Sequence, residues 1–258
     1  MRPLSAAGPG PDEEEPGETI PGKEGIRPVE GVVVAILALL AILAASGISL
    51  FALDGMPHVA DEQAYFFQAR VLSRGRIHLS PPAEPGLFDV QHVLIDDEGW
   101  RAMYPPGWPV LLATGILVGA PWLVNPLLLG LSVAMVWWLG RNLFDPEIGV
   151  VAALLLAGSP FALSMGAGTM SHPGTLLLAL LTLACLARAD RSPGRVLPWV
   201  LAGLAAGVCL SIRPFTAVLL LGPPVLAFAL RSPRRVRGLS LLASGALPGA
   251  LFLIGYNT

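Results

Sequence analysis

The chain alternates between long apolar runs and short polar breaks, except for one long polar stretch near its start. The first apolar run extends from Gly31 to Leu53, which is long enough for a helix to cross about 30 Å of hydrocarbon. A polar stretch from Asp54 to Pro106 follows. Further apolar runs lie near 108–120, 124–140, 148–165, 174–187, 197–211, 214–230 and 238–255. The pattern predicts an all-α fold, a polytopic bundle of membrane-spanning helices.

The composition narrows the class of protein further. Hydrophobic residues make up 54% of the chain and charged residues 13%, whereas a soluble domain has about 45–50% apolar and about 25% charged residues. This contrast excludes a soluble enzyme, a disordered protein and a nucleic-acid binder. Cys185 and Cys209 lie inside apolar runs, so they are predicted to be small packing residues and not a disulfide.

The first segment differs from the rest of the chain. Residues 1–30 are rich in Pro, Gly and Glu and contain no aromatic residue, so they are predicted to form a disordered cytoplasmic tail. The acidic character of this tail and the length of the run at 31–53 argue against a cleavable signal peptide. Residues 31–258 are predicted to form one transmembrane domain, with 54–122 as an external loop carrying juxtamembrane helices.

The run at 108–120 determines the topology. The count leaves out the basic residues of the long polar loop. If this run spans the membrane, four of the remaining basic residues face the cytoplasm and eight face the external side. If it lies at the interface instead, eleven face inward and one, Arg213, faces outward. Cytoplasmic loops carry an excess of Lys and Arg, so we expect about seven spans, a cytoplasmic N-terminus and a non-spanning 108–120 helix.

This topology gathers the polar chemistry on the external side. All four histidines of the chain lie there: His58, His78, His92 and His172. A transporter or flippase, the main alternative, usually has polar or broken-helix sites near the bilayer midplane. The predicted spans contain almost no ionisable groups, which favours an enzyme acting at the external face.

A cluster of polar and aromatic residues follows the first span directly. It reads DEQAY at 61–65, continued by FFQAR. On a helix, Asp61 and Tyr65 share one face. A carboxylate near the lipid boundary can have the raised pKa that suits proton abstraction. The alternative for these acids is a hydrated first helical turn, where Asp and Glu are common.

Four features in this order resemble the GT-C glycosyltransferases, in particular the protein O-mannosyltransferase and aminoarabinose-transferase branch, glycosyltransferase family 39 and its relatives. The first is the external DEQAY helix, continued by ARVLSRGRIHL. The second is a Pro-Pro motif opening a juxtamembrane helix, YPPGWP at 104–109. The third is a span ending in GRNLF at 140–144, and the fourth is Ser159-Pro160 followed by an external turn, MSHP at 170–173.

The resemblance implies a reaction. Such enzymes transfer a sugar from a polyprenyl-phosphate donor to an acceptor at the external or periplasmic face, with inversion at the anomeric carbon. The first acid of the external motif serves as the base, which corresponds to Asp61 here. The expected partners are this donor and membrane lipid, with no nucleic acid and an acceptor that the sequence does not identify. The expected location is a bacterial inner membrane, since Ala, Gly, Arg and Pro predominate over Lys.

Five further residues are expected to bind substrate. They are Glu62, Tyr65, Tyr104, His172 and Arg213. Arg213 lies between two spans, where a guanidinium matches phosphate geometry, although it could instead only extend to the interface. His172 and Tyr104 could equally be interfacial residues without a role, and Trp108 is a further candidate for lining the sugar site.

The chain departs from the related branch at one motif. Aminoarabinose transferases have Glu-Lys before the Pro-Pro and use it in a metal site, whereas this chain has Met103-Tyr104. We therefore expect no metal and no cofactor. The acids of DDEGW at 96–100 are interpreted as a solvated hairpin turn. Relatives usually have more spans, so the sequence is expected to be an N-terminal fragment or a short member, and an inactive truncated transferase is the third possibility.

Overall fold

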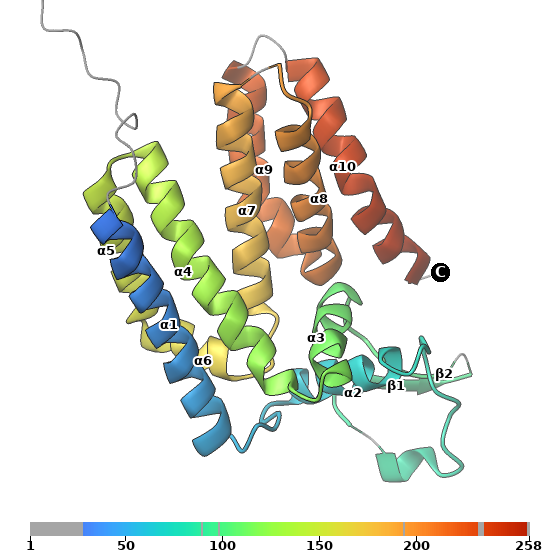
Figure 1. Ribbon diagram of the computed structural model, residues 1–258. Helices are drawn as coiled ribbons and strands as arrows, with labels where there is room; N and C mark the ends of the chain where they lie inside the picture. The colour runs from blue at the N-terminus through green and yellow to red at the C-terminus, as the bar shows by residue number, and fades with distance from the viewer. Residues whose placement is uncertain (1–27, 89, 98, 193, 232–234, 257–258) are drawn as a thin grey trace, which may run out of the picture.

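The computed structural model describes residues 28–88, 90–97, 99–192, 194–231 and 235–256. Helices dominate it (Figure 1). The α-helices are α1 Pro28–Phe51, α2 Ala60–Leu72, α3 Gly107–Leu117, α4 Val124–Leu143, α5 Pro146–Ala157, α6 Pro160–Ala167, α7 His172–Arg191, α8 Leu197–Ile212, α9 Pro214–Arg231 and α10 Arg235–Tyr256. Short 3-10 helices cover Pro85–Phe88 and Pro121–Leu123, and the strands are β1 Val93–Asp96 and β2 Gly99–Ala102. The predicted all-α membrane bundle is confirmed.

The long helices form two neighbouring groups. α1, α4, α5 and α6 pack together, α7, α8, α9 and α10 form the second group, and contacts between α4 and α7 join the two (Figure 1). Consecutive long helices run in opposite directions, so their connections lie at two ends of the bundle. α2, α3 and the β1–β2 hairpin lie together at the end where α1 finishes.

When only helix length and composition are considered, the structure has fewer candidate spans than the sequence predicts. Among the described residues, four helices are long and apolar enough to cross a membrane: α1, the helix Pro121–Leu143 that contains α4, α7 and Val236–Tyr256 of α10. α5 and α6 form a fifth span if the 57° bend between them lies within one crossing. The predicted total of seven requires the shorter helices α8 and α9 to cross as well.

The bend between α5 and α6 has a local cause. Pro160 supplies no backbone N–H for a helical hydrogen bond, so a continuous helix is interrupted there. Ser159 caps the new helix, since its hydroxyl accepts a hydrogen bond from Ala162 N at 3.3 Å. The sequence predicts one run at 148–165, and the structure divides it at Gly158 and Ser159.

α3 stays at one end of the bundle. Its 11 residues correspond to about 16 Å at 1.5 Å per residue, roughly half of the hydrocarbon thickness. It contacts α2 and the end of α8. Gly107 permits this approach, because a Cβ there would lie 2.6 Å from the backbone of Ser211. This geometry agrees with the interfacial helix expected from the distribution of basic residues.

Small residues permit close packing in the second group. A Cβ on Gly207 of α8 would lie 2.5 Å from the carbonyl oxygen of Ala246 on α10, and one on Gly203 would lie 2.9 Å from the carbonyl carbon of Leu242. The helix-packing interpretation of the Gly203–Gly207 spacing is therefore confirmed. Most of the predicted tail lies outside the described residues, but Pro28 to Glu30 already belong to α1. Glu30 forms an ion pair with Arg141 at the end of α4.

Candidate active site at the α2–α3 end

A buried carboxylate fixes the start of α2. One oxygen of Glu62, Oε2, accepts hydrogen bonds from His58 N at 2.9 Å and Val59 N at 3.5 Å. The other, Oε1, accepts one from Thr169 N at 2.7 Å, in the turn between α6 and α7. Only 5% of Glu62 is exposed. Both carboxylate oxygens of Glu62 therefore bind backbone amides, so we expect Glu62 to position the start of α2. Its substrate-binding role stays a prediction.

The turn between α6 and α7 is held from two more sides. Trp108 of α3 donates its indole N–H to Thr169 O at 2.8 Å. Asn125 of α4 donates its amide to Gly168 O at 2.7 Å and to Met170 O at 2.9 Å. Trp108 is fully buried, and its indole N–H is used to hold this turn; a role in lining the sugar site stays a prediction.

Substitution of Glu62 tests this positioning role. In Glu62→Gln an amide N–H₂ must face a backbone donor, so we expect the free energy of unfolding to fall by about 1–3 kcal/mol. Thermal unfolding of the purified protein measures the change. Glu84→Gln is the matched control, because Glu84 is exposed in the loop. Equal melting temperatures for the two variants would contradict the positioning role.

A hairpin presents two side chains to Asp61. β1 and β2 pair in antiparallel register from Val93↔Ala102 to Asp96↔Gly99, which confirms the hairpin interpretation of DDEGW. Gln68 of α2 anchors the hairpin, since its carbonyl oxygen accepts a hydrogen bond from Ala102 N at 2.9 Å. His92 lies opposite Met103, whose backbone N–H donates to His92 O at 3.0 Å. The ring of Tyr104, the next residue, lies 5.4 Å from the His92 ring between centroids.

Asp61 lies against this pair. The Tyr104 hydroxyl donates a hydrogen bond to Asp61 Oδ1 at 2.6 Å, and His92 Nε2 lies 3.3 Å from the same oxygen. The Asp61 side chain is nevertheless 39% exposed. Burial, followed by the hydrogen bond and the negative charge of Asp61, raises the pKa of the Tyr104 phenol far above its usual value. Tyr104 is therefore a neutral donor that orients the carboxylate and leaves one side open.

Tyr65 completes the aromatic wall on α2. Its ring lies 4.7 Å from that of Tyr104, and its hydroxyl is 3.4 Å from Ser171 Oγ. The residue is only 5% exposed, and burial raises the pKa of its phenol. Tyr65 thus packs against the Tyr104 ring, and its hydroxyl lies near Ser171, just before α7.

Arg213 and His172 reach the same group of side chains. Ile212, the residue before Arg213, packs in the same apolar cluster as Tyr65 and Tyr104, and Ser171, the residue before His172, lies 3.4 Å from the Tyr65 hydroxyl. Arg213 follows the last residue of α8, and its guanidinium forms no hydrogen bond or ion pair within the described part of the chain. His172 begins α7, and its buried Nδ1 has no hydrogen-bond partner there. The six predicted site residues therefore belong to the same end of the bundle, and their roles stay predictions.

Three contributors were not predicted from the sequence as site residues: His92, Asn125 and Gln68. Their positions carry only weak signals, namely a histidine in the polar stretch, an asparagine at the start of an apolar run and a glutamine one turn after Tyr65. Among the described residues, no group of three or more His, Cys, Asp or Glu side chains could hold a metal ion. The expectation of a metal-free site stays a prediction.

Comparison with known families defines the kind of protein. A model of the family described as dolichyl-phosphate-mannose-protein mannosyltransferase matches residues 108–255, more than half of the chain. Together with the helical membrane bundle, this match defines a membrane glycosyltransferase of the GT-C type. The chain belongs to the dolichyl-phosphate-mannose-protein mannosyltransferase family. No curated protein and no solved structure matches it.

The matched segment covers only part of the candidate site. His172 and Arg213 lie within residues 108–255, whereas Asp61, Glu62, Tyr65 and Tyr104 precede them. The family supports an integral membrane enzyme with a lipid-linked sugar donor. The roles of the individual side chains stay predictions.

Removal of the Tyr104 hydroxyl tests how the carboxylate is oriented. Hydrogen bonds to charged groups contribute about 1.5–3 kcal/mol, so Tyr104→Phe is expected to lower kcat by about 10- to 100-fold. Tyr65→Phe makes the same chemical change 3.4 Å from a serine instead of beside Asp61, and we expect a smaller effect. Transfer rates at saturating donor measure both. Equal rates for the two variants would contradict the orienting role.

Proposed function

We propose that this protein transfers a sugar from a polyprenyl-phosphate donor to an acceptor hydroxyl, with inversion at the anomeric carbon. One observation carries the proposal: an accessible carboxylate, Asp61, and a guanidinium with no hydrogen bond or ion pair among the described residues, that of Arg213, belong to the same end of the bundle. Asp61 is bonded to Tyr104, and Ile212, the residue before Arg213, packs in the same apolar cluster as Tyr104. A base and a cation are the two groups that such a transfer needs.

The proposed roles follow from the charges. Asp61 takes the proton of the acceptor hydroxyl as its oxygen attacks the anomeric carbon, and the bond from that carbon to the phosphate oxygen breaks. The lipid phosphate leaves with the electron pair, and Arg213 stabilises its negative charge. Tyr104 and His92 hold Asp61 Oδ1, so its second oxygen is available to the acceptor. His172, whose Nδ1 has no hydrogen-bond partner among the described residues, is proposed to contact the substrate.

Donor selectivity tests this function. Membrane vesicles containing the protein are supplied with a radiolabelled polyprenyl-phosphate sugar or with the corresponding nucleotide sugar. We expect label to leave only the lipid-linked donor, because a lipid-soluble donor reaches an active site at the end of a membrane bundle. Consumption of the nucleotide sugar alone would contradict the proposal. Movement of intact donor across the membrane would instead favour the flippase alternative.

The orientation of the bundle is part of the proposal. The end that carries Asp61 is proposed to face outward and the end that carries Arg188, Arg191 and Arg195 to face the cytoplasm, in accordance with the positive-inside rule. In a Cys185→Ala, Cys209→Ala background, we expect Gly194→Cys to be shielded from a membrane-impermeant thiol reagent in intact cells.

Ser80→Cys is the matched control for orientation, because Ser80 and Gly194 are both exposed and belong to opposite ends of the bundle. We expect Ser80→Cys to react readily in the same cells. Labelling of Gly194→Cys with protection of Ser80→Cys would reverse the proposed orientation.

A further inference from the structure

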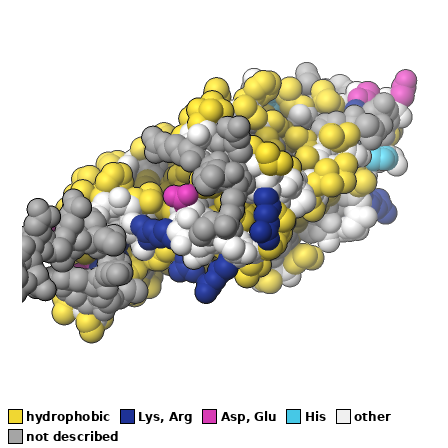
Figure 2. All heavy atoms as spheres, turned by 90° about the horizontal axis from the view of Figure 1, so that it is seen from above, with side chains coloured by type: hydrophobic (Ala, Val, Ile, Leu, Met, Phe, Trp, Pro, Cys, Tyr) yellow, Lys and Arg dark blue, Asp and Glu magenta, His cyan; other side chains and the backbone are white. Residues whose placement is uncertain are grey.

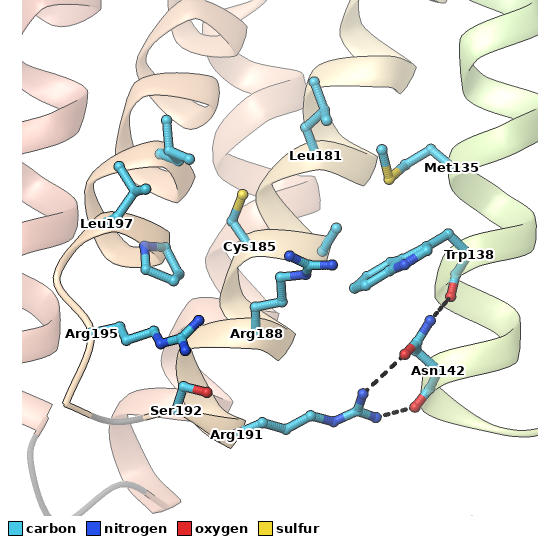
Figure 3. A pocket seen from close by; sticks show the side chains of 13 residues that line it. Met135, Trp138, Asn142, Leu181, Cys185, Arg188, Arg191, Ser192, Arg195 and Leu197 are labelled. Atoms are coloured by element: carbon cyan, nitrogen blue, oxygen red, sulfur yellow. Dashed lines mark hydrogen bonds between the residues drawn. The ribbon is translucent and has the colours of Figure 1, made fainter. Parts of the chain in front are cut away.

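A cavity of about 650 Å³ lies at the end of the bundle opposite Asp61. It is bounded by α4, α7 and the start of α8 (Figure 3). Its walls toward the middle of the bundle are apolar and include Met135, Leu181 and Leu201. The cavity is thus separate from the candidate active site, and the proposed sugar transfer makes no use of it.

Three arginines line the same cavity. They are Arg188, Arg191 and Arg195, and no acidic residue is among the described residues that line it. Figure 2 views the molecule from this end and shows side chains of Lys and Arg gathered near its centre. Since none of the described lining residues carries a carboxylate that would balance these charges, the cavity is suited to an anionic group.

The three guanidinium groups are held differently. Arg191 points toward α4 and donates a hydrogen bond to Asn142 Oδ1 at 3.1 Å, as well as one to the backbone oxygen of Asn142 (Figure 3). Arg188 lies over the Trp138 ring, 5.1 Å from its centroid, so its N–H groups keep their hydrogen-bonding capacity. Arg195 forms no hydrogen bond or ion pair within the part of the chain that the structure describes. Within the described residues, the guanidinium groups of Arg188 and Arg195 therefore keep hydrogen-bond donors that a ligand could use.

We propose that this cavity binds an anionic glycerophospholipid from the adjoining leaflet. Its phosphate would bind Arg188 and Arg195, because guanidinium groups form strong hydrogen bonds with phosphate oxygens. One acyl chain would lie along Met135, Leu181 and Leu201 toward the middle of the bilayer. Basic pockets between transmembrane helices have the combination of charge and apolar surface that suits such a headgroup. A free phosphate ion would use the arginines and leave the apolar walls without a partner.

Lipid retention tests the site. The purified full chain is placed in phosphatidylcholine nanodiscs that contain a minor fraction of phosphatidylglycerol, and retained lipid is counted by native mass spectrometry. We expect retention of phosphatidylglycerol over phosphatidylcholine. The double variant Arg188→Gln, Arg195→Gln is expected to bind it about 30-fold more weakly, since each arginine contributes about 1 kcal/mol.

Two further variants separate binding from folding. Arg74→Gln, Arg76→Gln removes the same charge from an exposed loop at the other end and is expected to retain phosphatidylglycerol. Leu181→Trp fills the cavity while keeping its arginines, and is expected to lose the lipid. Melting temperatures show that each variant is folded.

Several results would overturn the proposal. These are equal retention by the two double variants, equal retention of phosphatidylcholine, undiminished binding by Leu181→Trp, or displacement of the lipid by millimolar inorganic phosphate. Preferential retention of polyprenyl phosphate with the same arginine dependence would also overturn it, because the occupant would then be the donor lipid.

Discussion

Replacement of Asp61 by asparagine is expected to slow sugar transfer by about 10²- to 10⁴-fold, the usual contribution of a general base. The amide cannot take the proton of an acceptor hydroxyl. It still offers an oxygen to the Tyr104 hydroxyl, which donates to Asp61 Oδ1 at 2.6 Å, so the local structure should persist. The rate at saturating lipid-linked donor measures the loss, and the KM for donor should change little.

Asp190→Asn is the matched control for this prediction. Asp190 is exposed on the last turn of α7, at the opposite end of the bundle, so its removal changes the net charge by the same amount. We expect wild-type transfer from this variant. Transfer by Asp61→Asn at the rate of Asp190→Asn would exclude Asp61 as the base.

Replacement of Arg213 by glutamine is expected to weaken donor binding by about 10- to 100-fold. The estimate corresponds to about 1.5–3 kcal/mol for a hydrogen bond to a charged group. No hydrogen bond or ion pair within the described residues occupies the guanidinium, so its loss should affect the ligand more than the fold. The measurement is equilibrium binding of polyprenyl phosphate to the purified protein.

The comparison for Arg213 comes from the long loop. Arg76 is exposed in the loop that follows α2, at the end of the bundle that carries Asp61. Arg76→Gln removes the same charge as Arg213→Gln without changing a contact of Tyr65 or Tyr104. We expect this control to bind polyprenyl phosphate as the wild type does. Equal affinities of Arg213→Gln and Arg76→Gln would show that Arg213 does not bind the phosphate.

The helical bundle follows from the sequence because its signal is local. The apolar runs at 31–53, 124–140 and 174–187 predict α1, α4 and α7 directly. The span count is harder to predict, because α8 and α9 are short and Pro160 breaks the run that contains α5 and α6. Hydropathy alone does not distinguish a short crossing helix from a short interfacial one such as α3.

The candidate site shows where local patterns stop being informative. Asp61 and Tyr104 are 43 positions apart, and the hairpin that joins them is anchored by Gln68 through a backbone amide. No periodic pattern of apolar and polar residues in the sequence indicates that Asp61 and Tyr104 are in contact. The same limit applies to Glu62, whose neighbour Asp61 has the same charge. Their different roles appear only when Thr169, 107 positions away, is found beside Glu62.

The products formed from a doubly labelled donor test the central claim most directly. The purified protein in liposomes is given a polyprenyl-phosphate sugar that carries one label in the sugar and another in the phosphate, together with membrane extract as the acceptor source. We predict one polyprenyl phosphate released for each sugar transferred, and the opposite anomeric configuration in the product. Transfer of sugar and phosphate together, or intact donor recovered from the far leaflet without cleavage, would contradict a glycosyltransferase that uses Asp61 as base and a lipid phosphate as leaving group.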